Sequence, residues 1–197
     1  MKTMKTMKLW MMAAILFCGL GCSDGNKTNE ERTGSTEAVQ ESNALPGVER
    51  YLVDSIGPRY AQGDVCIPCV IVVTNEIWHG DSAKVKGDFW VFNYNIVGDT
   101  LKCVSGGSHP GMMILHFGND GKYVVTSFDQ VVDGAGNVES AKRIFGDVYD
   151  AFAAFSSDEK KREDTRASYI ADYVKAHNLP VKYYQDYGWP AKEIPAE

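Results

Sequence analysis

The stretch VKGDFWVFNYNIVGDTLKCVS, residues 85–105, decides the fold of this chain. Its side chains alternate in an extended backbone, where successive residues point to opposite faces. One face carries Trp90, Phe92, Tyr94 and Ile96, and the other carries Phe89, Val91, Asn93 and Asn95. The glycine and aspartate at 98–99 then provide a tight turn. The stretch therefore predicts a β-hairpin built from residues 85–97 and 100–105.

Further strands are expected before and after this hairpin. Residues 70–78 are dense in β-branched side chains, which favour a strand. After the hairpin, the segment GGSHPG at 106–111 interrupts the pattern, and residues 112–117 resume it. The tripeptide NDG predicts a second hairpin turn, with residues 123–132 as the returning strand. We predict an antiparallel meander of about four strands, one of them bent or broken at its two glycines.

Helices are expected at both ends of this region. Residues 45–60 repeat apolar side chains at helical spacing until a glycine–proline pair ends the pattern. The helical period returns at 144–155, where the apolar residues lie on one face. Ser156 and Glu159 resemble a capping box for a second helix, which Asn178 ends. The sequence therefore predicts two helices after the strands.

The predicted fold class is α+β. An N-terminal helix lies on an antiparallel meander of about four strands, and two C-terminal helices follow. This element order resembles the cystatin and NTF2-like group of folds, which includes many small envelope lipoproteins. The resemblance implies that Trp90, Phe92 and Tyr94 could line a concave apolar pocket of a curved sheet, with a rim covered by Tyr183, Tyr184, Tyr187 and Trp189. The alternative is that this aromatic stripe packs into a core layer. The aromatic tail at 180–195 is expected to be extended and to pack near the rim.

Composition limits the functions that the chain can have. The chain has 197 residues, a formal net charge of −6 and an apolar content of 44%. This length fits one folded domain, and the apolar content is sufficient for a core. An acidic chain has no general attraction for polyanions, so we predict no nucleic-acid partner.

The N-terminus has the parts of an export signal. Three lysines precede residues 9–17, an apolar run that is too short to span a membrane. Gly21 and Cys22 then resemble the lipobox of bacterial lipoproteins, although Leu20 sits one place closer to the cysteine than the usual leucine. The resemblance implies that residues 1–21 are removed and that Cys22 becomes the lipid-bearing N-terminus.

Lipidation of Cys22 predicts the location of the protein. The lipid makes the membrane a partner and anchors the chain in the bacterial envelope, at the outer membrane, facing the periplasm or the cell surface. A plain secretory signal, with Cys22 incidental, is the alternative. Residues 22–43 are polar and are expected to form a flexible tether. Residues 44–197 are expected to form the single domain.

Three cysteines remain in the predicted domain: Cys66, Cys69 and Cys103. An oxidising compartment favours a disulfide between Cys103 and one of the other two. Cys66 and Cys69 also have the C-x-P-C form of thioredoxin-like redox sites, but the residues that follow predict a strand rather than a helix. Buried free thiols are the third alternative. The spacing matches no zinc site, and no metal or cofactor is predicted.

The candidate ligand-binding or catalytic residues surround the glycine-rich segment. Ser108 and His109 lie within it, and glycines let a backbone approach a ligand closely. Asp88 precedes two aromatic residues, a setting that can raise its pKa and let it act with His109. A solvent-facing turn carboxylate is the alternative for Asp88. Trp90 and Tyr94 complete the candidate set. The alternative is a β-bulge that bends the sheet without a further role.

Three functions remain open at this point. The leading hypothesis is a lipid-anchored, non-enzymatic module that binds a small molecule or a protein partner. The first alternative is a small NTF2-like isomerase or hydrolase that uses His109 as its base. The second is a thiol-disulfide protein that uses Cys66 and Cys69. The sequence carries no catalytic signature that selects among them.

Overall fold

The computed structural model describes residues 42–196. The chain divides into two units, residues 1–37 and 38–197, and all described residues belong to the second. The predicted signal peptide, Cys22 and most of the tether lie outside the described residues. Ser42 is buried, and its carbonyl accepts a hydrogen bond of 2.7 Å from the Asn75 amide. The packed part of the chain thus includes the last residues of the predicted tether.

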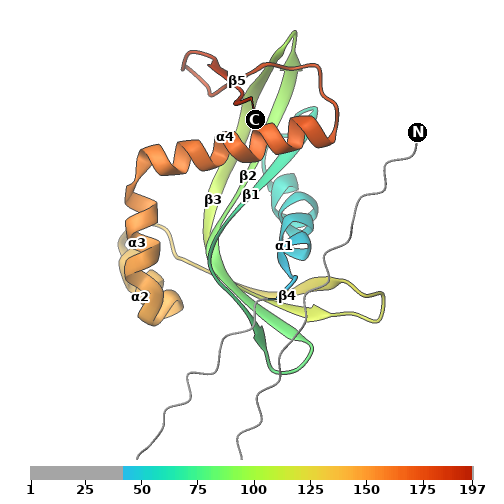
Figure 1. Ribbon diagram of the computed structural model, residues 1–197. Coiled ribbons are helices and arrows are strands. Elements are labelled where there is room, and N and C mark those ends of the chain that lie inside the picture. Colours follow the sequence, from blue (N-terminus) through green and yellow to red (C-terminus); the bar gives the residue numbers. More distant parts are fainter. Residues whose placement is uncertain (1–41, 197) are drawn as a thin grey trace, which may run out of the picture. The chain divides into compact units, whose positions relative to one another are not determined.

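A mixed sheet forms the centre of the described unit (Figure 1). Its strands are β1 (Val65–Trp78), β2 (Ser82–Val97), β3 (Thr100–Phe117), β4 (Tyr123–Gln130), β5 (Tyr183–Gln185) and β6 (Lys192–Glu193). The order is β1-β2-β3-β5-β6, and β4 pairs with the other half of β3. The sheet is curled, and β2 lies between β1 and β3 along almost its full length. The α+β class is therefore confirmed.

The predicted four-strand meander is wrong in two respects. Within residues 42–196 the sheet has six strands, and β5 runs parallel to β3, with Leu101 opposite Tyr184. The tail reaches this position because the main-chain N–H groups of Lys182 and Tyr183 both donate to the carbonyl of Asp99 in the β2–β3 turn, at 2.8 and 3.1 Å. A tail of three paired residues has no periodicity that could predict this contact.

The glycine-rich segment is a strand and not a loop. β3 runs without a break through Gly106, Gly107 and Gly111, which pair with residues of β2 and β4. A Cβ atom at Gly107 would lie 2.4 Å from the hydroxyl oxygen of Tyr60. Glycine is required here because another part of the chain approaches the strand closely. The sheet is irregular nearby, where the register shifts between Asn93 and Tyr94.

The N-terminal helix packs on one face of the sheet. It comprises α1 (Leu45–Tyr51), one π-helical turn at Leu52–Ile56 and a 3₁₀ turn at Gly57–Arg59. Its buried side chains contact β1, β2 and β3 in the largest core cluster. These side chains are Val48, Leu52 and Ile56, each fully buried. The predicted helix is confirmed, including its end near Gly57 and Pro58. We call this side of the sheet the α1 face.

Three helices, rather than the predicted two, lie after β4. They are α2 (Asn137–Phe145), α3 (Tyr149–Ser157) and α4 (Glu159–Ala176), with 3₁₀ turns at Gly134–Gly136 and Gly146–Val148. The single helix predicted at 144–155 is divided because Gly146 has a φ of +59°, a conformation that L-residues rarely adopt. The cap of α4 is Asp158, whose carboxylate accepts from Lys161 N, and not Ser156.

These helices contact the second face of the sheet, which we call the α4 face. Ala167 and Ile170 of α4 pack with Ile67, Tyr94 and Leu101 from the strands. The two side-chain sets of β2 therefore enter different clusters, since its alternate residues Phe89 and Val91 belong to the core under α1. The predicted alternation of β2 is confirmed. None of the described helices is long and apolar enough to cross a membrane.

Candidate functional site

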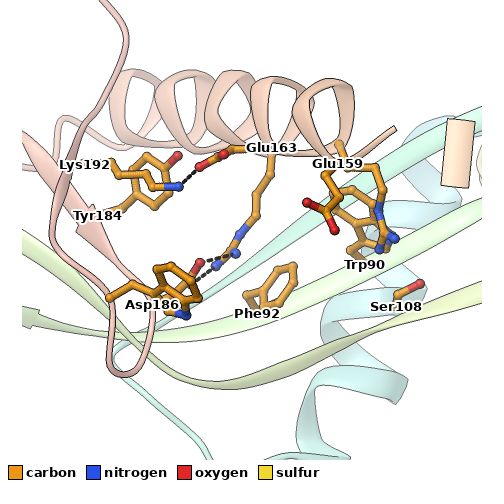
Figure 2. A pocket seen from close by; sticks show the side chains of 11 residues that line it. Trp90, Phe92, Ser108, Glu159, Glu163, Tyr184, Asp186 and Lys192 are labelled. Atoms are coloured by element: carbon orange, nitrogen blue, oxygen red, sulfur yellow. Dashed lines mark hydrogen bonds and ion pairs between the residues drawn. The ribbon is translucent and has the colours of Figure 1, made fainter. Parts of the chain in front are cut away.

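A cavity of about 410 Å³ lies on the α4 face, lined by residues of α4, β2, β3 and the C-terminal segment. Volumes of this size are typical of small-molecule sites. Figure 2 shows Trp90 and Ser108 toward one end, Asp186 and Lys192 toward the other, and Phe92 between them. We call this cavity the α4 pocket. Two of the five predicted site residues, Trp90 and Ser108, line it.

Arg166 of α4 joins the helix to the sheet and to the C-terminal segment. Its Nη1 and Nη2 atoms donate to the two carboxylate oxygens of Asp186 at 2.8 and 2.5 Å. Its Nε and Nη2 atoms donate to the hydroxyl oxygen of Tyr94 at 3.1 and 2.7 Å. The guanidinium also stacks on Phe92, with Cζ 3.9 Å from the ring centroid. The predicted residue Tyr94 thus lies beneath the pocket as a support for Arg166.

The charge of Arg166 is stabilised in this position. Burial disfavours the charged form, but the Tyr94 oxygen and the Asp186 carboxylate outweigh it and raise the pKa of the guanidinium. Burial raises the pKa of the Tyr94 phenol, which therefore remains a neutral hydroxyl. Only 15% of the Arg166 side chain is exposed, against 35% for Asp186. The pair is shielded from water far more than a surface ion pair.

Two further cations border the pocket. The guanidinium of Arg162 lies over the Trp90 ring, with Cζ 5.0 Å from its centroid. Its Nη1 atom donates to the carbonyl of Ser156 at 3.2 Å. Lys192 of β6 forms an ion pair with Glu163 of α4 (Figure 2). The Lys192–Glu163 pair, like the Arg166–Asp186 pair, ties the C-terminal segment to α4.

Asp88 lies beneath the Trp90 end of the pocket. Its side chain is 2% exposed, and Ser108 Oγ donates to its Oδ1 at 2.6 Å. Burial raises the pKa of this carboxyl, while the Ser108 hydroxyl opposes the shift. A solvent-facing turn carboxylate, the alternative interpretation of Asp88, is wrong because the residue is buried within β2. The indole N–H of Trp90 lies near the Asp88 carboxyl group and also opposes the rise in its pKa. This N–H forms no hydrogen bond of normal geometry with any residue in 42–196.

His109 lies on the opposite side of the sheet. It pairs with Phe89, so its side chain is on the α1 face. Its Nε2 atom is 2.9 Å from the hydroxyl of Tyr60, and its Nδ1 atom is 2.9 Å from Nε2 of Gln130. Burial, followed by the charge of Arg59, lowers the pKa of the imidazole. His109 therefore links the N-terminal helix to β4.

The hypothesis that Asp88 and His109 act together is not supported by this geometry. Residues directly opposite each other on β2 and β3 lie on the same face of the sheet. Asp88 lies opposite Pro110, whereas His109 lies opposite Phe89 on the other face. Ser108 is the polar neighbour that Asp88 contacts directly. The charges of Asp88 and His109 still influence each other, but each side chain forms its hydrogen bonds with other partners.

The three cysteines of the described residues are free thiols. Cys66 lies opposite Asn93 and Cys69 opposite Trp90, so the two point to opposite faces of β1. Cys103 is on β3, with β2 between it and both of them. Neighbouring strands are about 4.8 Å apart, which makes two strand spacings too long for a disulfide. The predicted disulfide with Cys103 is not formed.

The redox hypothesis lacks the features that it needs. Desolvation by burial raises the pKa of Cys66 and, more strongly, that of Cys69. A reactive redox thiol needs a lowered pKa, because the thiolate is the nucleophile. Both cysteines also lie within a strand, and no helix begins beside them. Free thiols, the third alternative, describe what the structure contains.

Comparisons with known proteins give no match: no family, no curated protein and no solved structure is significantly similar to this chain. The candidate site therefore rests on its own geometry. Sequence reasoning missed Arg162 and Arg166, although their four-residue spacing on a predicted helix was a usable signal. It included Trp189 only as a possible rim residue, and it missed the partner carboxylate of Asp186.

Proposed function

We propose that this protein is a lipid-anchored, non-enzymatic binding module of the bacterial envelope, and that it holds a small ligand in the α4 pocket. The observation that carries the proposal is the preformed wall of this pocket. Arg166, Asp186 and Tyr94 are fixed by four hydrogen bonds to one another. A site whose polar groups are already ordered loses little conformational entropy on binding.

An exposed aromatic residue supports the same proposal. Trp189 lines the pocket, and its side chain is 67% exposed. It sits in a turn that is held by a hydrogen bond from Trp189 N to the Asp186 carbonyl, at 3.1 Å. A large apolar side chain held in water by an ordered turn is typical of binding surfaces. Arg166 fixes Asp186 from one side, and the turn presents Trp189 from the other.

Filling the pocket is expected to abolish ligand binding. In Ser108→Phe, a large ring replaces a small exposed side chain on the pocket wall, so it occupies the space that a ligand needs. The full chain, purified in detergent, is screened by thermal unfolding against saccharides, amino acids, nucleotides and short-chain carboxylic acids. We expect the stabilisation given by a ligand to be lost in this variant.

Ser127→Phe is the matched control, because Ser127 is exposed on β4 and lies outside the pocket lining. It carries the same change of size and polarity and should retain the stabilisation by ligand. Both variants are first compared by circular dichroism to establish that they are folded. A compound that stabilises Ser108→Phe as strongly as the native chain would show that the α4 pocket is not its site.

Replacing Cys22 by serine is expected to release the protein from the membrane fraction. Serine lacks the thiol that carries the acyl chain, and each buried methylene contributes about 0.8 kcal/mol to membrane binding. Metabolic labelling with a fatty-acid analogue, followed by fractionation, measures the effect. Cys18→Ser, within the predicted signal, should leave labelling unchanged. Continued labelling of Cys22→Ser would contradict the proposed anchor.

A further inference from the structure

The charges that line the α4 pocket are balanced. The lining contains three acidic and three basic side chains: Glu159, Glu163, Asp186, Arg162, Arg166 and Lys192. Two acid–base pairs among them are closed, between Arg166 and Asp186 and between Lys192 and Glu163. A ligand with a net charge would be attracted by the lining residues of opposite charge and repelled by an equal number of like charge. The lining therefore favours a ligand that is neutral overall.

The same walls offer both donors and acceptors of hydrogen bonds. Arg166 directs four of its five N–H groups to Asp186 and Tyr94, and the Cys103 thiol also lies beside its guanidinium. Arg162 uses one N–H group on the Ser156 carbonyl, so its guanidinium supplies further donors to the pocket. Each oxygen of Asp186 accepts one of these bonds and keeps a lone pair. The proton of Ser108 is directed to Asp88, so its oxygen is left as an acceptor. A ligand group that both donates and accepts, such as a hydroxyl, matches this set.

The aromatic side chains differ in whether a ring face is free. Arg162 covers a face of Trp90, and Arg166 covers a face of Phe92. Tyr184 is 4% exposed. Trp189 is therefore the aromatic residue of the lining with a large exposed surface, at 67%. The negative face of an indole attracts groups with a positive edge, such as the polarised C–H groups of a sugar ring.

We propose that the α4 pocket binds a neutral saccharide. A pyranose ring lies on the indole of Trp189, and its hydroxyl groups bond to the Arg166–Asp186 pair and to Ser108. This inference rests on the proposed binding function and specifies its ligand class. Hydroxyl groups satisfy the mixed donors and acceptors, the ring packs on Trp189, and the absence of charge matches the balanced lining.

The test uses the full chain in detergent on an array of neutral, uronic-acid and sialic-acid glycans. We expect binding to neutral glycans, and isothermal titration with the strongest of them then gives its affinity. Trp189→Ala should weaken this affinity by about tenfold or more, because exposed aromatic anchors dominate such sites. Raising NaCl from about 0.05 M to about 0.5 M should change the affinity by less than about twofold, since no ion pair is formed.

Tyr187→Ala is the matched control for Trp189→Ala. Tyr187 lies in the same turn, is 94% exposed and does not line the α4 pocket. Tyr187→Ala also removes an exposed aromatic side chain from this turn. Because Tyr187 does not line the pocket, the affinity for the glycan should stay within about twofold of the native value. Because both residues are exposed, neither variant is expected to unfold. Equal losses in the two variants would overturn the assignment of Trp189 as the platform for the sugar ring.

Other results separate the ligand class from the pocket itself. Binding confined to acidic glycans, with strong salt dependence, overturns the neutral saccharide. So does the absence of any glycan binding when an amino acid, a peptide or another charged compound gives a thermal shift that Ser108→Phe removes. In that case the proposed binding function stands with another ligand. If no compound of either screen gives a shift that Ser108→Phe removes, the binding function and the saccharide fail together.

Discussion

Phe145→Ala is expected to lower the free energy of unfolding by about 3–5 kcal/mol, the range for removal of a fully buried phenylalanine ring. Phe145 has no exposed surface, and its ring stacks on Phe152 with centroids 3.9 Å apart and planes 6° from parallel. Ala141 and Ile144 of the same helix and Val131 after β4 complete the cluster. The loss is large because these residues come from separate elements and cannot all move to fill a cavity.

Urea unfolding followed by circular dichroism measures this effect. Val138→Ala on the same helix is the control, because Val138 is 55% exposed and its truncation should cost less than about 0.5 kcal/mol. If Phe145→Ala does not fold, Phe145→Leu reduces the ring to a smaller apolar group with a milder loss. A loss below about 1 kcal/mol for Phe145→Ala would show that α2 does not pack on the sheet as described.

The central hairpin could be predicted from the sequence because its information is local. Alternation in β2 separates Phe89 from Trp90, and the structure places these neighbours in different core clusters. Gly98 adopts a φ of +63° in the turn, as a two-residue hairpin requires. Period and turn chemistry are both properties of residues close together in the chain, so no tertiary contact was needed to interpret them.

The glycines of β3 were interpreted either as part of a ligand-binding segment or as a bend in the sheet, but the tertiary contacts that require them were not predicted. A Cβ atom at Gly106 would lie 2.3 Å from the carbonyl oxygen of Val91, and one at Gly107 would meet Tyr60. Consecutive glycines in a sequence usually indicate a turn, and nothing local distinguishes a strand that other residues approach closely. The strand fixes His109 on the α1 face, opposite Phe89.

The candidate site was predicted in part. Trp90 and Ser108 could be selected because they lie in or beside the hairpin pattern. The Arg166 network could not, because it joins residues 94, 166 and 186 through contacts that no local pattern encodes. The short parallel pairing of β5 with β3 brings Asp186 to α4, and that pairing has three residues on each strand. Local sequence patterns do not predict sites that are assembled from segments far apart in the sequence.

Arg166→Met is expected to lower the free energy of unfolding by about 2–4 kcal/mol, near the range for breaking a buried ion pair and somewhat reduced because Asp186 is partly hydrated. Methionine keeps an aliphatic side chain but removes the guanidinium that stacks on Phe92, and it donates no hydrogen bond. The fully buried hydroxyl of Tyr94 then loses two donors, and the Asp186 carboxylate loses its counter-charge. Arg166→Lys should recover only part of the loss, because one ammonium cannot reproduce the fork of the guanidinium.

Arg162→Met is the matched control one helical turn away. Arg162 forms one side-chain hydrogen bond to a carbonyl, at 3.2 Å, and its removal should cost less than about 1 kcal/mol. A double-mutant cycle of Arg166→Met with Tyr94→Phe should give a coupling energy of about 1 kcal/mol or more. Similar losses at positions 162 and 166 would contradict the network. Because Arg166 holds Asp186 and the turn that presents Trp189, the destabilised variant should also lose ligand binding, whereas Arg162→Met should keep the turn in place.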